Sequence, residues 1–141
     1  MRYVLDASVA FKWEVPEPDS DKANRLRDDF RNGVHELVAP DFFPQELAHA
    51  LTRAERQGRI AVGQAAIFWA DAMTTPPALA PVLALTPRAV NISSTLRIGV
   101  YDCLYVALAE QEGCEFIKAD DKLVRNLQPQ FPFVVPLTSM P

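Results

Sequence analysis

Short apolar runs alternate along the chain with longer segments of helical periodicity. The first run, Tyr3-Val4-Leu5, is rich in strand-favouring side chains and stops at Asp6. A short apolar run without alternation is typical of a strand covered on both faces, as in the centre of a parallel sheet. Further strands are predicted at about 36–39, 81–85, 115–118 and 133–136.

Helices are predicted between these strands. Apolar residues at helical spacing, such as Leu47, Leu51 and Ala54, mark the segment 41–58 as amphipathic. The other predicted helices cover about 7–14, 20–32, 62–73, 86–97, 101–112 and 121–127. Strands that alternate with helices indicate βαβ units, right-handed crossovers and a parallel sheet. We therefore predict an α/β fold, with residues 1–141 forming one domain.

Composition agrees with a single soluble domain. The chain has 141 residues, of which 49% are hydrophobic, and this is enough for one sizeable core. No apolar stretch approaches the roughly 20 residues that span a bilayer, and because no basic segment followed by an apolar one is visible before the first strand, we expect no secretory signal. Two cysteines, Cys103 and Cys114, fit neither a disulfide framework nor a zinc site. We expect no membrane association and a cytoplasmic location.

The net charge of −4 at first argues against a nucleic-acid partner, because phosphate-binding proteins are usually basic. Four acidic residues are assigned below to a metal site, and without them the remaining charge is balanced. The charge therefore neither supports nor excludes an RNA substrate.

Asp102 is the only charged residue in the apolar segment 98–109. A helix that is apolar on nearly all sides is a buried helix, and a carboxylate in such a helix is costly unless a cation or hydrogen-bond donors compensate it. The alternative is that Asp102 lies in the first helical turn and interacts with the helix dipole. Taken alone, the residue leaves both readings open.

Three other acids occupy comparable positions. Asp6 and Asp120 each follow a predicted strand, where an N-cap is the simple interpretation, and Glu46 lies about one turn into a helix, where a solvated side chain is common. In a parallel sheet, however, all these junctions lie along one edge, so Asp6, Glu46, Asp102 and Asp120 are expected to converge. Converging carboxylates repel, and hard oxygen donors without a His or Cys cluster favour Mg²⁺ or Mn²⁺. Metal-assisted phosphodiester hydrolysis, with the ion activating water and offsetting charge on the leaving oxygen, is the chemistry that this pattern implies.

Four segments of the chain together resemble the signature segments of PIN-domain ribonucleases, most closely the VapC toxin branch of type II toxin–antitoxin pairs. They are Val4–Trp13, Pro44–Ala48, Tyr101–Ala109 and Ala119–Leu123. The resemblance covers nearly the whole chain. It implies a three-layer α/β/α sandwich with a central parallel sheet, an Mg²⁺- or Mn²⁺-dependent endoribonuclease, a homodimer, and inhibition by a small DNA-binding antitoxin. The expected products are a 5′-phosphate and a 3′-hydroxyl.

Matched residue by residue, the resemblance assigns the metal and catalytic positions to Asp6, Glu46, Asp102 and Asp120. Ser8 matches the small hydroxyl residue that supports the first Asp. Two positions depart from the family pattern. Lys118 stands where Thr is frequent before the last acid, which could alter hydrogen bonding around the metal ligands, and His49 stands where Asn is common. Neither change removes a ligand.

Other polar residues allow two interpretations each. Asp121 is either a water-mediated metal ligand or a helix cap, and we favour the cap. Lys12 and Lys118 are candidates for contacting substrate phosphate, although an ordinary surface position is the simpler interpretation. His35 and His49 form no pair at metal-ligand spacing, so we expect neither to bind metal.

Two further function classes compete with the nuclease. A phosphoacceptor signalling module needs paired acids after the first strand and an Asp ending the third, whereas the sequence has a lone Asp6 and, at the predicted end of the third strand, Thr86. A catalytically idle PIN-like scaffold would have no need of four acids. We also expect Asp102→Asn to stabilise the metal-free protein, because it removes one member of a repelling set.

Overall fold

The computed structural model describes residues 1–141 and contains one five-stranded sheet in which every strand pair is parallel. The strands follow the order β3-β2-β1-β4-β5. Their bounds are β1 Arg2–Leu5, β2 Glu36–Pro40, β3 Ala78–Ala80, β4 Glu115–Lys118 and β5 Val134–Pro136. The apolar run at the N-terminus forms the central strand, and Val4 and Leu5 are fully buried. The prediction of a buried parallel strand is confirmed.

Seven α-helices surround the sheet. They are α1 Ala7–Glu14, α2 Ser20–Arg31, α3 Phe43–Arg56, α4 Gln64–Ala72, α5 Thr86–Leu96, α6 Val100–Glu112 and α7 Asp121–Leu127. Two 3-10 turns, η1 Leu83–Leu85 and η2 Leu137–Ser139, complete the chain. Each predicted helix is present, with ends that move by a few residues.

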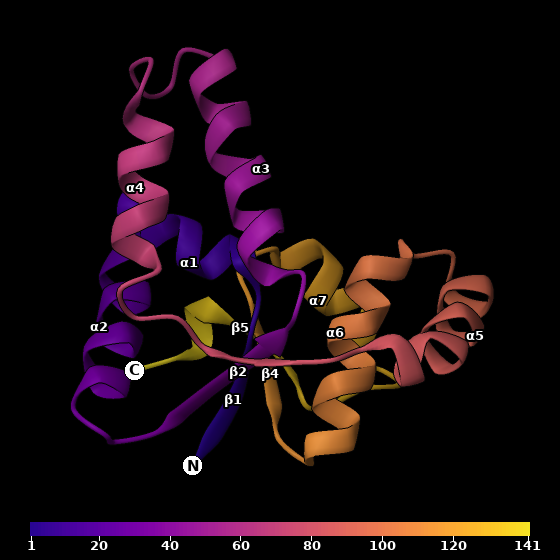
Figure 1. The fold of residues 1–141 in the computed structure, drawn as a ribbon. Coiled ribbons are helices and arrows are strands. Elements are labelled where there is room, and N and C mark those ends of the chain that lie inside the picture. Colours follow the sequence, from indigo (N-terminus) through magenta and orange to yellow (C-terminus); the bar gives the residue numbers. More distant parts are fainter.

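The sheet separates two hydrophobic cores. Because side chains alternate along a strand, Leu5 and Ile117 face the core shared with α1, α2, α3 and α4, whereas Val4 and Phe116 face the core formed with α5, α6 and α7. Figure 1 shows these two groups of helices on opposite sides of the sheet. The predicted three-layer α/β/α sandwich is confirmed.

The third strand is the one element that sequence reasoning misplaced. The prediction was 81–85, but β3 is Ala78–Ala80, and Leu83–Leu85 form the turn η1 instead. The strand ends where its only partner ends, since Pro40 of β2 is paired with Ala80. Beyond Pro81 the chain has no strand to pair with, and it enters α5 through η1, leaving Leu83 exposed.

Helices α3 and α4 form a hairpin that projects beyond the rest of the molecule (Figure 1). The base of the hairpin packs on α1, and its core residues include Leu47, Leu51 and Ala65. This placement matters for the site, because one face of α3 borders the carboxyl edge of the sheet. None of the helices is long and apolar enough to cross a membrane.

Candidate active site

A cleft of about 590 Å³ lies at the carboxyl edge of the sheet. Asp6, Glu46, Asp102 and Asp120 all line it. Asp6 follows β1 and Lys118 ends β4, and these neighbouring strands connect to opposite halves of the sheet. A crevice at such a reversal of strand order is where open α/β sheets bind ligands. The structure therefore brings the four predicted acids to one cleft.

Asp6 is held in place by the start of α1. Its Oδ2 accepts a hydrogen bond of 2.9 Å from the backbone N–H of Ser8, so the residue is the N-cap of α1. Its Oδ1 lies 3.3 Å from Nζ of Lys118. The residue is 4% exposed. Capping and facing the cleft are thus compatible, because each function uses a different oxygen.

Lys118 lies at the centre of the acidic cluster. Its Nζ is 3.0 Å from Oδ1 of Asp102 and 3.3 Å from Oδ1 of Asp6. Burial alone would lower the pKa of Lys118, but the carboxylates of Asp6 and Asp102 together raise it, so the ammonium stays charged. The residue is only 7% exposed, and the interpretation of Lys118 as an ordinary surface cation is wrong.

Asp102 is less buried than its sequence surroundings indicate. Residues from Cys103 to Ala109 of α6 are buried, but the Asp102 side chain lies in the first turn and is 32% exposed. The apolar pattern describes the body of the helix, whereas the carboxylate projects from its N-terminal end into the cleft. Both sequence interpretations hold in part, since Asp102 is near the helix N-terminus and is also paired with a cation.

Glu46 reaches the cleft from α3. Its Oε1 accepts a hydrogen bond of 2.6 Å from the hydroxyl of Tyr105, a fully buried residue of α6. Burial raises the pKa of Glu46 to about 7, the Tyr105 hydrogen bond opposes this rise, and the nearby Asp6 carboxylate adds to it. Without a divalent ion, Glu46 is therefore partly protonated near neutral pH.

Asp120 lines the cleft but contacts none of the other three acids. Its Oδ1 accepts a hydrogen bond of 3.1 Å from the backbone N–H of Leu123, so it is the N-cap of α7. Asp121 is the first residue of α7, is exposed and does not line the cleft. The interpretation of Asp121 as the cap is therefore wrong, because Asp120 holds that position.

The donor set fits a hard divalent cation in its chemistry. Carboxylate oxygens with no sulfur donor and no histidine pair are what Mg²⁺ and Mn²⁺ prefer. As the side chains stand, no three acidic, His or Cys residues are arranged so that they could hold one ion. The Lys118 ammonium lies between Asp6 and Asp102, where a shared ion would bind. A metal site here requires that this ammonium move.

Comparison with family models gives a match over residues 3–127, to the PIN domain. The chain is a PIN domain. PIN domains are generally nucleases. A comparison with curated proteins finds no match.

Two solved structures share the fold of this PIN domain. The crystal structure of PAE2754 from Pyrobaculum aerophilum superposes with a TM-score of 0.69 at 18% identity, covering 99% of this chain and 94% of that chain. The crystal structure of VapBC2 from Rickettsia felis, bound to a DNA fragment from their promoter, superposes with a TM-score of 0.65 at 15% identity, covering 96% and 97%. At these identities the likeness establishes the fold.

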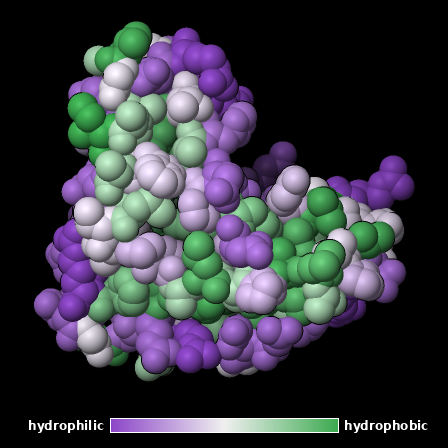
Figure 2. Space-filling view, viewed as in Figure 1, coloured by the Kyte–Doolittle hydropathy of each residue, from purple (hydrophilic) through white to green (hydrophobic).

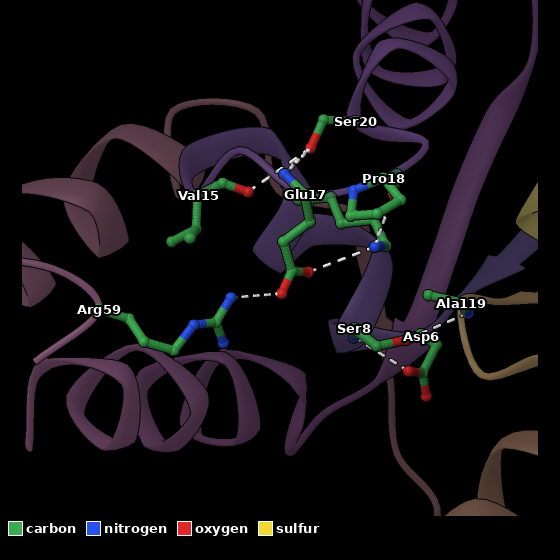
Figure 3. Close-up of polar contacts among 9 residues, drawn as sticks. Asp6, Ser8, Val15, Glu17, Pro18, Ser20, Arg59 and Ala119 are labelled. Atoms are coloured by element: carbon green, nitrogen blue, oxygen red, sulfur yellow. Dashed lines mark hydrogen bonds and ion pairs between the residues drawn. The ribbon is translucent and has the colours of Figure 1, made fainter. Parts of the chain in front are cut away.

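Ser8 ties the two sides of the PIN domain's cleft together. Its Oγ accepts a hydrogen bond of 3.3 Å from the backbone N–H of Ala119, and its own backbone N–H donates to the Asp6 carboxylate (Figure 3). The residue thus joins the start of α1 to the segment between β4 and α7. This geometry is compatible with the supporting position that the family resemblance assigns to Ser8.

An ionic group at the rim includes Lys12. Its Nζ lies 3.3 Å from Glu17 and donates a hydrogen bond of 2.8 Å to the carbonyl of Pro18. Glu17 also pairs with Arg59, so one carboxylate holds two cations of the cleft (Figure 3). A phosphate contact by Lys12 would have to compete with Glu17.

Sequence reasoning missed Tyr105, Arg53 and Arg59. Arg53 is exposed, lines the cleft and forms no ion pair. It lies seven positions after Glu46, on the same helical face as His49, so helical spacing alone could have identified it. His49 lines the cleft, whereas the buried His35 lies outside it, edge-on to Tyr3.

Proposed function

We propose that this PIN domain is a divalent-metal-dependent endoribonuclease and the toxin of a toxin–antitoxin pair. The observation that carries the proposal is the convergence of Asp6, Glu46, Asp102 and Asp120 in one cleft at the carboxyl edge of the sheet. Lys118 contacts two of them, Asp6 and Asp102, and its positive charge lowers the pKa of a third, Glu46. An isolated structural role for each acid does not account for their common location.

The chain's own residues divide the work of the site. Asp6, Glu46 and Asp102 would hold Mg²⁺ or Mn²⁺, with Asp120 at the margin of the cleft. Such an ion, when bound, polarises water and offsets negative charge on the phosphate. Ser8 orients Asp6, and the Tyr105 hydroxyl orients Glu46. These contacts orient Asp6 and Glu46, whereas the Lys118 ammonium has to move before an ion can bind.

Cations on the cleft wall would position the RNA backbone. Arg53 is free of ion pairs and lines the cleft on the α3 side, so its guanidinium is available for a phosphate oxygen. Lys12 and Lys118 are the other candidates, and both have carboxylate partners that a phosphate would have to replace. Arg53 is thus the best-placed residue for the first phosphate contact.

The toxin assignment rests on the four sequence segments and on the likeness to the VapBC2 complex of Rickettsia felis. It predicts a small DNA-binding antitoxin as partner and a homodimer in solution. Exposed apolar side chains gather on β3, η1 and α5, where Leu79, Leu83 and Val90 are 46%, 86% and 47% exposed (Figure 2). Exposed apolar groups of this kind support a protein partner. Light scattering of the purified protein tests the dimer.

The nuclease proposal is tested by RNA cleavage with Mg²⁺ or Mn²⁺, with EDTA, and with Asp102→Asn. We expect cleavage only with the metal and the intact carboxylate. Asp28→Asn is the matched control, because Asp28 is an exposed residue of α2 outside the cleft. Cleavage that survives both EDTA and Asp102→Asn would refute the proposal. A protein that neither binds Mn²⁺ nor cuts RNA would instead be an idle scaffold.

A further inference from the structure

Lys118 has an unusual combination of properties for a residue of a cation site. It is buried and charged, and it lies within hydrogen-bond distance of two carboxylates, at 3.0 Å from Asp102 and 3.3 Å from Asp6. Neither carboxylate oxygen has another cationic partner.

The sheet dictates where this ammonium lies. Strand β4 pairs with β1 in parallel, with Ile117 opposite Leu5, and the backbone N–H of Asp6 donates to the carbonyl of Ile117 at 3.1 Å. Ile117 faces the core of α1–α4, so the next residue, Lys118, faces the other side, where α6 begins. Register and alternation together direct Lys118 to the space between Asp6 and Asp102.

The charges around this space require a cation. Asp6 and Asp102 would repel each other without one, and the charges of both raise the pKa of Glu46. A divalent ion ligated by Oδ1 of Asp6 and Oδ1 of Asp102 would occupy the region that the ammonium now fills. The same two oxygens therefore serve either the lysine or the ion, and the two cations compete.

We propose that Lys118 is a built-in counter-cation that holds the acidic cluster together without metal and weakens divalent-ion binding by competing for Asp6 and Asp102. The proposal rests on the metal site of the proposed function. It adds that Lys118 lowers the affinity of this site for a divalent ion. The metal-free protein therefore keeps Asp6 and Asp102 in place. A divalent ion binds them only when the Lys118 ammonium moves away, and this movement lowers the affinity for the ion.

The test compares wild type with Lys118→Met, which keeps the length of the side chain and removes its charge. Mn²⁺ affinity is measured by titration calorimetry and the melting temperature is measured in EDTA. We expect Lys118→Met to bind Mn²⁺ about tenfold or more tightly, a difference of about 1.4 kcal/mol in binding free energy. We also expect its metal-free melting temperature to fall by roughly 6–12 °C, because a buried pair loses one partner.

Lys122→Met is the matched control, since Lys122 is an exposed residue of α7 outside the cleft. It should change neither quantity. A purely structural lysine would lower the melting temperature without tightening Mn²⁺ binding, so unchanged or weaker binding in folded Lys118→Met overturns the proposal. If Lys118→Met is unfolded in EDTA, Mn²⁺ must restore the fold, and failure to do so equally overturns it.

The outcome is separable from that of the nuclease proposal. Wild type that cuts no RNA, together with Lys118→Met that binds Mn²⁺ tightly, would refute the nuclease and support Lys118 as the competing cation. Wild type that cuts RNA, together with equal Mn²⁺ affinity in both proteins, would support the nuclease and refute the role of Lys118.

Discussion

Asp102 shows how one neighbouring residue changes the expected effect of a substitution. From the sequence alone, Asp102→Asn should stabilise the metal-free protein by relieving repulsion. In the structure Asp102 is paired with Lys118 at 3.0 Å, so the substitution removes an attraction. We now expect Asp102→Asn to lower the free energy of unfolding in EDTA by about 1 kcal/mol, a modest value because the side chain is partly exposed.

Urea denaturation in a double-mutant cycle tests this expectation. In the Lys118→Met background the repulsion is uncompensated, and Asp102→Asn should then be stabilising. Equal effects of Asp102→Asn in both backgrounds would show that Lys118 and Asp102 are not coupled.

Tyr105 carries a second prediction about a single residue. Its ring is fully buried and stacks on Phe116 with the centroids 5.2 Å apart, and its hydroxyl donates to Glu46. Tyr105→Phe keeps the packing but leaves a half-buried carboxyl without its donor, which should cost about 1–3 kcal/mol of unfolding free energy. Tyr101→Phe, at an exposed ring of the same helix, is the control. Equal stability of the two variants would contradict the importance of the hydrogen bond.

At the scale of elements, one buried ionic group joins three helices. Arg27 of α2 contacts Glu14 of α1 and Asp71 of α4, each at 3.3 Å, and lies over the Trp13 ring. Burial raises the pKa of Glu14 to about 7, with a further rise from Asp71 that outweighs the opposing effect of Arg27. The folded state therefore holds a proton that the unfolded state releases near its ordinary pKa of 4.5.

This linkage predicts a pH effect for Glu14→Gln. Glu14 stabilises the fold below pH 4.5, and its contribution is lost as the pH rises through about 7. The variant resembles the protonated form, so it should match wild type near pH 5 and be more stable by about 1–2 kcal/mol near pH 8. Urea denaturation at both pH values measures the difference, with the exposed Glu36→Gln as control. A difference that does not grow with pH would exclude the linkage.

The end of α6 depends on a backbone conformation that favours glycine. Gly113 has φ +65°, whereas Gly99 at the other end has φ −56°, and a Cβ at either position meets no atom within 4 Å. Gly113→Ala should therefore cost about 1–2 kcal/mol through conformational strain alone. Gly99→Ala should be neutral or stabilising by up to about 1 kcal/mol. Thermal unfolding of the two variants tests this difference. Equal melting temperatures would contradict the interpretation that the positive φ of Gly113 makes an alanine costly there.

Much of the element order could be predicted because local patterns determine it. The apolar run before Asp6 and the periodicity of α3 require no knowledge of the rest of the chain. The position of β3 could not be predicted in this way, because it depends on where β2 ends at Pro40. Likewise, Asp6 and Asp120 could be located from strand ends, but the ion pairs of Lys118 require the β1–β4 register and the packing of α6.

At the scale of the whole molecule, the parallel sheet gathers residues from distant parts of the sequence at one edge. Strands β1 and β4 bring Asp6 and Lys118 together, and α3 and α6 add Glu46 and Asp102 from opposite layers. The net charge of −4 does not describe this cleft, which brings Asp6, Glu46, Asp102 and Asp120 together and has Arg53 and Arg59 on its wall. Charge distribution, more than net charge, makes the cleft compatible with an RNA backbone.

The ends of the cleaved RNA test the central claim most directly. Hydrolysis assisted by a divalent ion uses water as the nucleophile, so we predict 5′-phosphate and 3′-hydroxyl termini, and cleavage of a substrate whose scissile nucleotide lacks its 2′-hydroxyl. Mass spectrometry of the products from a defined RNA with Mn²⁺ identifies these termini. A 2′,3′-cyclic phosphate would show that the RNA's own hydroxyl attacks, and would contradict the account of the four carboxylates as a metal-dependent hydrolytic site.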